Sequence, residues 1–407
     1  MPVDRRKALV FGAALALRLV LLLLFPSLPD LLTGRVEVST PVNSFKRLQE
    51  GLFLYTRNIS PYDGGVFHQA PILLPLFSLL PNSRDFPLPT AVFYSLIDLV
   101  NANALITISD SGQSVSSRLY SALRKDIRWD GASIAAWFLF NPFTIATCLG
   151  RPTSVLTTSG ILYAVSNAVC GNSFNAMLAL GFASYLSIYP ALLFIPLVIL
   201  CYDIQVQKAK TPSSATLFAL KHFGILLASV AGLLGISALI IGDFGEFVSA
   251  TYGFQLLVPD LTPNIGLWWY FFIEIFDSFR EFFLGVFWLH LAGYVGGLTV
   301  RLRQQPLFII TSLLAFSPSS SHTRLMTAVM RYTFFASSAL LYATLLGPAF
   351  YHLWIYAGSG NANFFYAITL VWSLGLSILL ADTIFAALRE EWELENPEMR
   401  GKDVRQV

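Results

Sequence analysis

The sequence predicts an all-α, polytopic membrane protein with about 10–12 transmembrane helices. Hydrophobic residues make up 55% of the 407 residues and charged residues only 12%, whereas a soluble domain carries about a quarter charged residues. The mean hydropathy is +0.63, and the apolar residues fall in runs that suit membrane spans. No polar stretch is long enough for a large soluble catalytic domain, and a net charge of +2 argues against a nucleic-acid partner.

The first hydrophobic segment is predicted to be an uncleaved transmembrane helix. Basic residues at 5–7 precede an apolar run from Ala8 to Phe25. A run of about 18 residues is longer than a signal-peptide core, and prolines follow it instead of a small-residue cleavage site. Because basic residues favour the cytosolic side, we expect the N-terminus in the cytosol and the next segment in the lumen. Arg18 lies inside this run and is expected to snorkel or to pair.

Residues 26–70 form the longest stretch of mixed polarity and are predicted to be a luminal loop. Within this loop, residues 42–54 (VNSFKRLQEGLFL) have the pattern of a short amphipathic helix lying on the membrane surface. The triplet Asn58-Ile59-Ser60 is a formal glycosylation sequon, and the Pro61 that follows argues against its use.

Further predicted spans crowd the rest of the chain. The apolar stretches are 71–80, 88–108, 134–149, 155–169, 174–202, 217–241, 282–300, 306–316, 332–356 and 364–388. The stretches 71–80 and 306–316 are about ten residues long, too short to cross a bilayer alone, so the helix count stays open. Basic connections at 118–128, 208–221 and 301–303 predict cytosolic turns.

These patterns predict one multispanning domain, 1–388, followed by a charged cytosolic tail, 389–407. The domain has two predicted luminal loops, 26–70 and 242–267. Its cysteines lie in or beside apolar runs without metal-ligand spacing or a nearby histidine, which favours a packing role (Cys148, Cys170, Cys201). No Walker, Rossmann, Gly-x-Ser-x-Gly or HExxH pattern is present. We expect no metal or cofactor from these motifs.

Three polar segments stand out because polar groups near hydrocarbon are costly unless they have a use. The first is 60–71 (SPYDGGVFHQAP), which places Tyr62 and His68 just before a predicted membrane helix. This segment is interpreted either as a polar-lipid or sugar site at the membrane face or as a tight turn with a proline helix start.

The second segment is 258–272 (VPDLTPNIGLWWYFF), in which prolines and a glycine frame Asp260 and Asn264 ahead of an aromatic cluster. Acidic residues spaced by three and four follow it and are expected on one helical face (Glu274, Asp277, Glu281). Such a stripe is either a paired-carboxylate site or the wet face of an interfacial helix.

The third segment is 352–366 (HLWIYAGSGNANFFY). Small residues and two asparagines, Asn361 and Asn363, lie between aromatics that include Trp354 and Tyr356. A neutral hydrogen-bonding loop of this kind suits a glycan or a lipid head group. The alternative is that the asparagines cap a helix.

These segments carry a resemblance. SPYDGGVFHQAP (60–71), PDLTPNIGLWWYFF (259–272) and HLWIYAGSGNANFFYAITL (352–370) closely resemble the PIG-U family, and RVEVSTPVNSFKRLQEG (35–51) is similar as well. The likeness covers essentially the whole chain. It implies a multi-pass subunit of the GPI (glycosylphosphatidylinositol) transamidase of the endoplasmic reticulum. It also implies a membrane fold similar to that of dolichol-phosphate-mannose-dependent glycosyltransferases.

The resemblance implies a non-catalytic role, because the catalytic cysteine and histidine belong to the PIG-K subunit. The expected partners are the GPI lipid and the PIG-K, PIG-T, PIG-S and GPAA type subunits. The loops 357–363 and 259–266 match motif positions expected to face the GPI. The candidate GPI-binding residues are therefore Asn361, Asn363, Asn264, Asp260, Trp354, Tyr356, His68 and Tyr62.

Two other classes of function remain open. A luminal mannosyltransferase of this fold carries an acidic motif in the first luminal loop, where a carboxylate acts as the base. Here the matching stretch, 37–41, contains one acid, Glu37, so a binder that has lost catalysis fits better. A transporter needs a charge relay through several spans, for which only Asp98 and Asp382 qualify.

One segment departs from the family pattern. Residues 306–331 read PLFIITSLLAFSPSSSHTRLMTAVMR, where the resemblance leads us to expect a longer apolar passage with a Lys-x-Tyr-Pro-like turn. The serine run 317–321, with His322 and Arg324, indicates either a shortened span or a faulty gene model.

Overall fold

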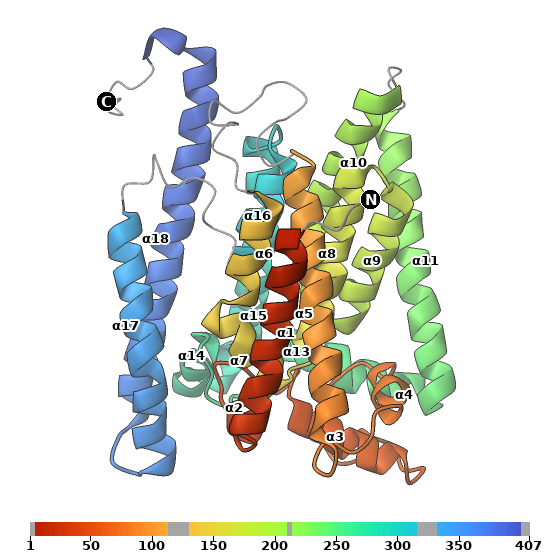
Figure 1. The fold of residues 1–407 in the computed structure, drawn as a ribbon, viewed down its shortest axis with the longest axis vertical. Helices are drawn as coiled ribbons and strands as arrows, with labels where there is room; N and C mark the ends of the chain where they lie inside the picture. Colours follow the sequence, from red (N-terminus) through yellow and green to blue (C-terminus); the bar gives the residue numbers. More distant parts are fainter. Residues whose placement is uncertain (1–4, 113–129, 210–213, 316–331, 400–407) are drawn as a thin grey trace. The chain divides into compact units, whose positions relative to one another are not determined.

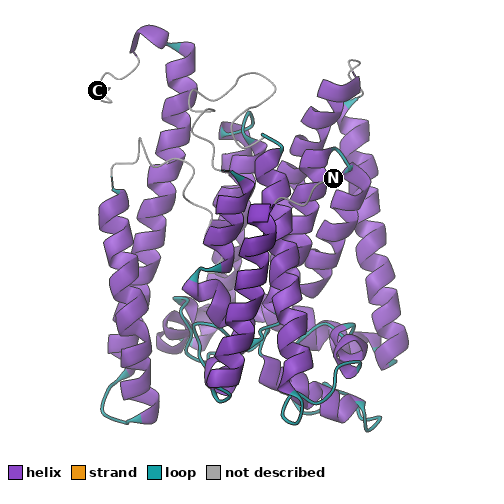
Figure 2. Ribbon diagram, viewed as in Figure 1, coloured by secondary structure: helices purple, strands orange, loops and turns teal. Residues whose placement is uncertain are grey.

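The computed structural model describes residues 5–112, 130–209, 214–315 and 332–399. These residues are helical or in loops, and none of them forms a strand (Figure 2). The chain separates into two compact units, which are described one at a time. The predicted cytosolic turn at 118–128 and the serine run 317–324 lie outside the described residues.

Unit 1 contains the described residues up to Asn264 together with 281–288. Its helices are α1 (Arg5–Leu24), α2 (Leu28–Thr33), α3 (Phe45–Tyr55), α4 (Leu73–Ser78), α5 (Pro87–Asp110), α6 (Gly131–Leu139), α7 (Pro142–Gly150), α8 (Ser154–Cys170), α9 (Ser173–Leu186), η2 (Tyr189–Leu193), α10 (Phe194–Ala209), α11 (Ala215–Ile241), α12 (Phe244–Val248), η3 (Ser249–Gly253) and α13 (Phe254–Leu257). Figure 1 shows the short α2, α3 and α4 gathered at the end of unit 1 where α1 finishes.

Unit 2 contains 265–280 and the described residues from 289 onward, so α15 contributes to both units. Its helices are α14 (Trp268–Glu274), η4 (Asp277–Phe279), α15 (Arg280–Arg301), α16 (Pro306–Ala315), α17 (Thr333–Tyr351), η6 (His352–Tyr356), α18 (Ala362–Glu395) and η7 (Pro397–Met399). Helix α18 continues past residue 388, so the first part of the predicted tail is helical.

Long apolar helices dominate both units. Within the described ranges, 7 helices are long and apolar enough to cross a membrane, or 8 if the bent pair α6–α7 counts as one span. Two shorter apolar helices, α8 and α9, pack against each other inside unit 1. The prediction of an all-α polytopic membrane protein is confirmed.

The break between α6 and α7 exposes polar backbone inside a span. The two helices are bent by 56°, and Pro142, which lacks a backbone N–H, starts α7. The next N–H, that of Phe143, bonds to the Asn141 side chain at 2.9 Å instead of to the Leu139 carbonyl. The Leu139 carbonyl therefore needs a donor from another part of the chain.

Arg18 of α1 supplies that donor. Its Nη2 donates to the Leu139 carbonyl at 3.1 Å, and its Nη1 donates to the Ala14 carbonyl of its own helix at 3.1 Å. The guanidinium also bonds to the Asp98 carboxylate of α5, through Nη2 at 2.8 Å and Nε at 3.1 Å. Arg18 is 2% exposed and Asp98 3%. Of the two predicted roles for Arg18, the structure therefore shows pairing.

The apolar stretch 174–202 was expected to be one span, and this prediction is wrong. Ser187 is extended (φ −154°, ψ 148°), Pro190 follows, and the stretch divides into α9 and the η2–α10 helix. The Ile188 N–H freed at the break bonds to the Gln255 side chain at 3.1 Å. Proline and a side chain from another segment together stabilise a break that apolarity alone does not reveal.

The helix predicted at 42–54 exists as α3, and part of its apolar face packs on protein. Phe45 and Leu48 are buried in a core formed with α4, other parts of the segment 26–80 and α5. The Phe45 ring lies edge-on to the rings of Phe77 and Tyr94, with centroids 6.1 and 6.4 Å away. Amphipathicity predicted the helix, and the chain's own aromatic residues cover the face that we assigned to lipid.

In unit 2, α17 and α18 form a helical hairpin whose turn contains the third polar segment. The chain leaves α17 through the π-helical turn η6. The Ser359 and Gly360 N–H groups then both donate to the Leu353 carbonyl, at 3.0 and 3.1 Å. Gly358 has φ +64°, and a Cβ on Gly360 would lie 3.1 Å from the Trp354 backbone nitrogen. The turn therefore requires glycine at two positions for two different reasons.

Replacing Arg18 by Gln is expected to destabilise the protein by about 3–5 kcal/mol, because Asp98 becomes a buried, unpaired charge. The matched control is Lys7→Gln, since Lys7 and Asp110 form an exposed ion pair at 3.4 Å between the same two helices. That change is expected to cost about 1 kcal/mol or less. Thermal melting in mild detergent measures both losses of stability. If Arg18→Gln and Lys7→Gln lowered the melting temperature equally, the buried Arg18–Asp98 pair would not be a main stabilising contact. The double replacement Arg18→Leu with Asp98→Leu is expected to be more stable than Arg18→Gln.

Replacing Gly360 by Ala is expected to distort the α17–α18 turn, because backbone atoms limit the space for a Cβ. Gly358→Ala is expected to cost about 1–2 kcal/mol, since the left-handed conformation strains an L-residue. The control is Gly235→Ala in α11, where no atom lies within 4 Å of the added Cβ. Melting temperatures should fall for both turn variants and not for the control. A Gly360→Ala protein that melts with the control would show that the turn tolerates a side chain.

Candidate functional site

The predicted site residues fall into two groups. Tyr62, His68, Asp260 and Asn264 belong to unit 1, where the segments 60–71 and 246–262 are joined by hydrogen bonds. Trp354, Tyr356, Asn361 and Asn363 belong to unit 2, beside α14. The two groups differ in how far their polar atoms are already satisfied.

Tyr62 is buried and stabilises the fold of the segment 60–71. Its hydroxyl donates to the Gln69 carbonyl at 2.8 Å and accepts a hydrogen bond from Thr251 at 3.5 Å. Burial raises the pKa of Tyr62, so the phenol stays protonated. Gln69 in turn bonds to Thr153 at 3.0 Å and to the Ser44 carbonyl at 2.7 Å. The segment 60–71 is thus a hydrogen-bonded turn anchored on three other segments.

His68 is held between a ring and a carbonyl. Its ring stacks on Phe254 with centroids 3.6 Å apart, and its Nδ1 lies 2.9 Å from the Ala250 carbonyl. A carbonyl only accepts, so Nδ1 carries the proton. Burial lowers the pKa of His68, which keeps the imidazole neutral near pH 7. The π-helical turn η3 contains Ala250 and brings its carbonyl to the imidazole.

Asp260 is committed to an ion pair. Its carboxylate lies 2.9 Å from Nη2 of Arg47 on α3 and accepts hydrogen bonds from the backbone and side chain of Thr262. Partial burial raises the pKa of Asp260. The hydrogen bonds from Thr262 and Arg47 lower it by more than burial raises it, so the pKa of Asp260 lies below its usual value. Asn264 donates from Nδ2 to the Thr262 carbonyl at 3.1 Å. This loop is built around the carboxylate.

In unit 2 the predicted residues lie on an aromatic cluster. Trp269 of α14 stacks on Trp354 with ring centroids 5.9 Å apart, and Tyr270 stacks on Tyr366 at 4.2 Å. Phe365 packs against both tryptophan rings. Tyr356 is exposed, whereas Trp354 is half-buried. The cluster therefore presents flat apolar ring faces next to the polar α17–α18 turn.

One buried donor in this cluster has no acceptor. Trp269 is 2% exposed, and its Nε1–H bonds to none of the residues that the structure describes. A buried N–H without an acceptor costs about 1–3 kcal/mol. Trp269 lies in the 259–272 motif but is not among the predicted site residues. That the N–H of a core tryptophan lacks an acceptor becomes visible only when the positions of the surrounding atoms are known.

The two asparagines have different roles. Asn361 is the N-cap of α18, with its side chain accepting from the Phe364 N–H at 3.3 Å, so the capping interpretation holds for this residue. Asn363 accepts a hydrogen bond from the Tyr270 hydroxyl, which ties the turn to α14. Both asparagines are exposed. Their amide groups therefore remain accessible beside the ring cluster.

The acidic stripe predicted after this motif does not form on one helix. Helix α14 ends at Glu274, Ile275 is extended (ψ 149°), and η4 and α15 start anew. Because the backbone changes direction, the helical spacing that placed Glu274, Asp277 and Glu281 together does not apply. Among the described residues, no three potential ligands gather as in a metal site.

The remaining candidate acids already have partners within the chain. Glu37 accepts hydrogen bonds from Arg35, two residues away, at 3.2 and 3.3 Å. Asp98 pairs with Arg18, and Asp382 accepts the Tyr332 N–H at 2.8 Å. Cys148 and Cys201 are buried and Cys170 is exposed.

Comparisons with known proteins agree on one family. The model of "GPI transamidase subunit PIG-U" matches residues 12–372. The human "GPI-anchor transamidase component PIGU" is 32% identical over 404 residues, covering 90% of this chain and 91% of that protein. The "GPI transamidase component GAB1" of Saccharomyces cerevisiae is 32% identical over 415 residues, covering 95% of this chain and 96% of its own. This multi-pass membrane protein belongs to the PIG-U family.

Proposed function

We propose that this chain is a non-catalytic subunit of the GPI transamidase in the endoplasmic reticulum membrane, where it binds the GPI lipid. The family membership and the names of its relatives, which are transamidase components, support the assignment to the complex. The expected partners are the PIG-K, PIG-T, PIG-S and GPAA type subunits, with the catalytic residues on PIG-K. The relatives' names do not support the alternative of a mannosyltransferase.

The observation that carries lipid binding is the pair of accessible asparagines beside stacked aromatic rings, and the unmet Trp269 N–H, enclosed in this ring cluster, becomes a further donor when a ligand parts the rings. Sugar rings present apolar C–H faces that pack on aromatic rings, and hydroxyl oxygens that accept N–H donors. An uncharged site of this kind selects a glycan without acid–base chemistry. We place the GPI contacts on Trp354, Asn361, Asn363 and the ring cluster of unit 2.

The unit 1 candidates have a different proposed role. Tyr62, His68 and Asp260 use their polar groups on Gln69, Ala250 and Arg47. We propose that they hold the first luminal loop against 246–262 and that they contribute to GPI binding only through this framework. Glu37 bonds to its neighbour Arg35, an arrangement that competes with service as a catalytic base.

Trp269→Phe and Asn363→Lys test this function. Trp269→Phe keeps an aromatic ring and deletes the N–H, so GPI attachment to a reporter protein in microsomes should fall roughly threefold to tenfold. Asn363→Lys removes the acceptor of Tyr270 and adds a charge, and it should lower attachment at least as much. The complex should still assemble, as measured by co-purification of a cysteine-protease-like subunit.

Two control variants separate binding from folding. Asn361→Asp keeps a good N-cap for α18 and should preserve the melting temperature. Asn167→Lys changes an exposed asparagine near the end of α8 and should leave attachment unchanged. Normal attachment in both Trp269→Phe and Asn363→Lys would refute the site. Mannose transfer from a dolichol donor by the isolated chain would refute the function.

A further inference from the structure

Unit 1 contains a second buried arginine whose charge the described residues do not pair. Arg151 directly follows α7, is 5% exposed, and has a left-handed backbone with φ +58°. Its backbone is anchored on both sides, since its N–H donates to the Thr147 carbonyl at 3.0 Å and its carbonyl accepts from the Tyr94 hydroxyl at 2.6 Å. The next N–H after Pro152, that of Thr153, bonds to the Asn43 carbonyl at 2.9 Å. The position of Arg151 is therefore rigid.

The guanidinium has a ring beside it and no counter-ion. Its central carbon lies 5.6 Å from the centre of the Phe45 ring. Among the described residues, no carboxylate oxygen lies within 4.0 Å of the Arg151 nitrogens. The exposed Asp30 on α2 attracts the guanidinium only by a longer-range electrostatic interaction. The neighbouring Arg18 differs, because Asp98 neutralises it. An unpaired buried cation costs several kcal/mol, so this site favours an anion.

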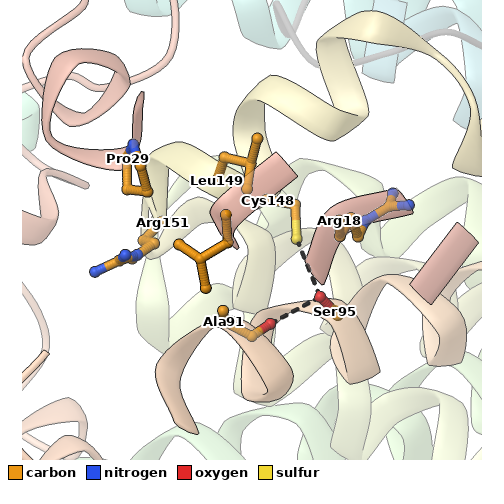
Figure 3. A pocket seen from close by; sticks show the side chains of 8 residues that line it. Arg18, Pro29, Ala91, Ser95, Cys148, Leu149 and Arg151 are labelled. Atoms are coloured by element: carbon orange, nitrogen blue, oxygen red, sulfur yellow. Dashed lines mark hydrogen bonds between the residues drawn. The ribbon is translucent and has the colours of Figure 1, made fainter. Parts of the chain in front are cut away.

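The surroundings of Arg151 indicate where the anion comes from. Arg151 lines a narrow pocket together with the apolar residues Leu22, Pro29, Ala91 and Leu149, with Ser95 and Cys148, and with Arg18, whose charge Asp98 neutralises (Figure 3). The guanidinium groups of Arg18 and Arg151 point away from each other in this view. Arg151 is 5% exposed, and its side-chain nitrogens keep a small accessible area.

The pocket lies where membrane-spanning elements end. Leu22 is in the last turn of α1, Ala91 is near the start of α5, and Leu149 is in the last turn of α7. Beyond Leu22, the side chains of Leu23, Leu24 and Phe25 are exposed. Lipid phosphates lie at the depth at which spans end, and apolar side chains just inside that depth contact acyl chains.

We infer that Arg151 binds the phosphate of an anionic phospholipid at the edge of the membrane. The planar guanidinium offers paired N–H donors that match two phosphate oxygens, which a lysine ammonium does not reproduce. The apolar pocket wall lies next to this head-group position. The site is in unit 1 and uses none of the residues proposed to contact the GPI, so either proposal can fail without the other.

The test measures lipid binding by the complex that contains the full chain, purified in mild detergent and depleted of lipid. Phosphatidylinositol should bind to the wild type and raise its melting temperature, as followed by native mass spectrometry and thermal melting. Arg151→Gln should weaken this binding about tenfold or more, because a hydrogen-bonded charge contact is lost. Arg151→Lys should retain part of the affinity. The matched control Arg57→Gln removes an exposed arginine that stacks on Phe53 and should bind like the wild type.

Three results would overturn the inference. Equal phosphatidylinositol binding by Arg151→Gln and the wild type would remove Arg151 from the site. Equal binding of phosphatidylcholine and phosphatidylinositol would show that the site does not prefer an anionic lipid. Equal stabilisation by inorganic phosphate alone would show that the ligand is a free anion and not a lipid. Melting of the lipid-depleted variants checks folding, and Arg151→Gln should not melt below the wild type, because it removes an unpaired charge.

Discussion

Unit 1 depends on the buried contact between Arg18 and Asp98. A guanidinium has enough N–H donors to serve the Asp98 carboxylate, the Ala14 carbonyl and the Leu139 carbonyl at once. The last of these carbonyls is free only because α6 and α7 are broken at Pro142. One side chain therefore joins α1, α5 and the broken α6–α7 span. Beyond α7, the Thr153 N–H bonds to the Asn43 carbonyl, which ties this part of the chain to the segment before α3.

The polar residues of the two units illustrate the difference between a framework and a binding surface. In unit 1 the candidate residues use their polar groups within the chain, as Tyr62 does on Gln69 and Asp260 does on Arg47. In unit 2 a buried tryptophan N–H lacks an acceptor and two asparagines are exposed. A subunit that holds a lipid-linked glycan needs neutral donors, acceptors and ring faces more than shifted pKa values. This chemistry agrees with the non-catalytic role proposed above.

Polar motifs were easier to find in the sequence than their roles. The segments 60–71, 258–272 and 352–366 were all selected, because polar residues next to spans are costly. Asn361 proved to be an N-cap, and His68 is stacked and hydrogen-bonded. Trp269 and Arg151 were missed. A tryptophan in an aromatic run and an arginine between two apolar segments look ordinary until their partners are known.

The sequence by itself determined the all-α membrane class, most of the helices and the family, because apolar run length, helix periodicity and local motifs are properties of contiguous residues. Only the tertiary structure decided which polar atoms remain unsatisfied. It also showed that the apolar face of α3 packs on protein and that Arg18 reaches a carbonyl far along the chain. The physical reason is that hydrogen bonding and burial depend on atoms brought together from distant segments. The spacing of residues within one segment does not predict these contacts between distant segments.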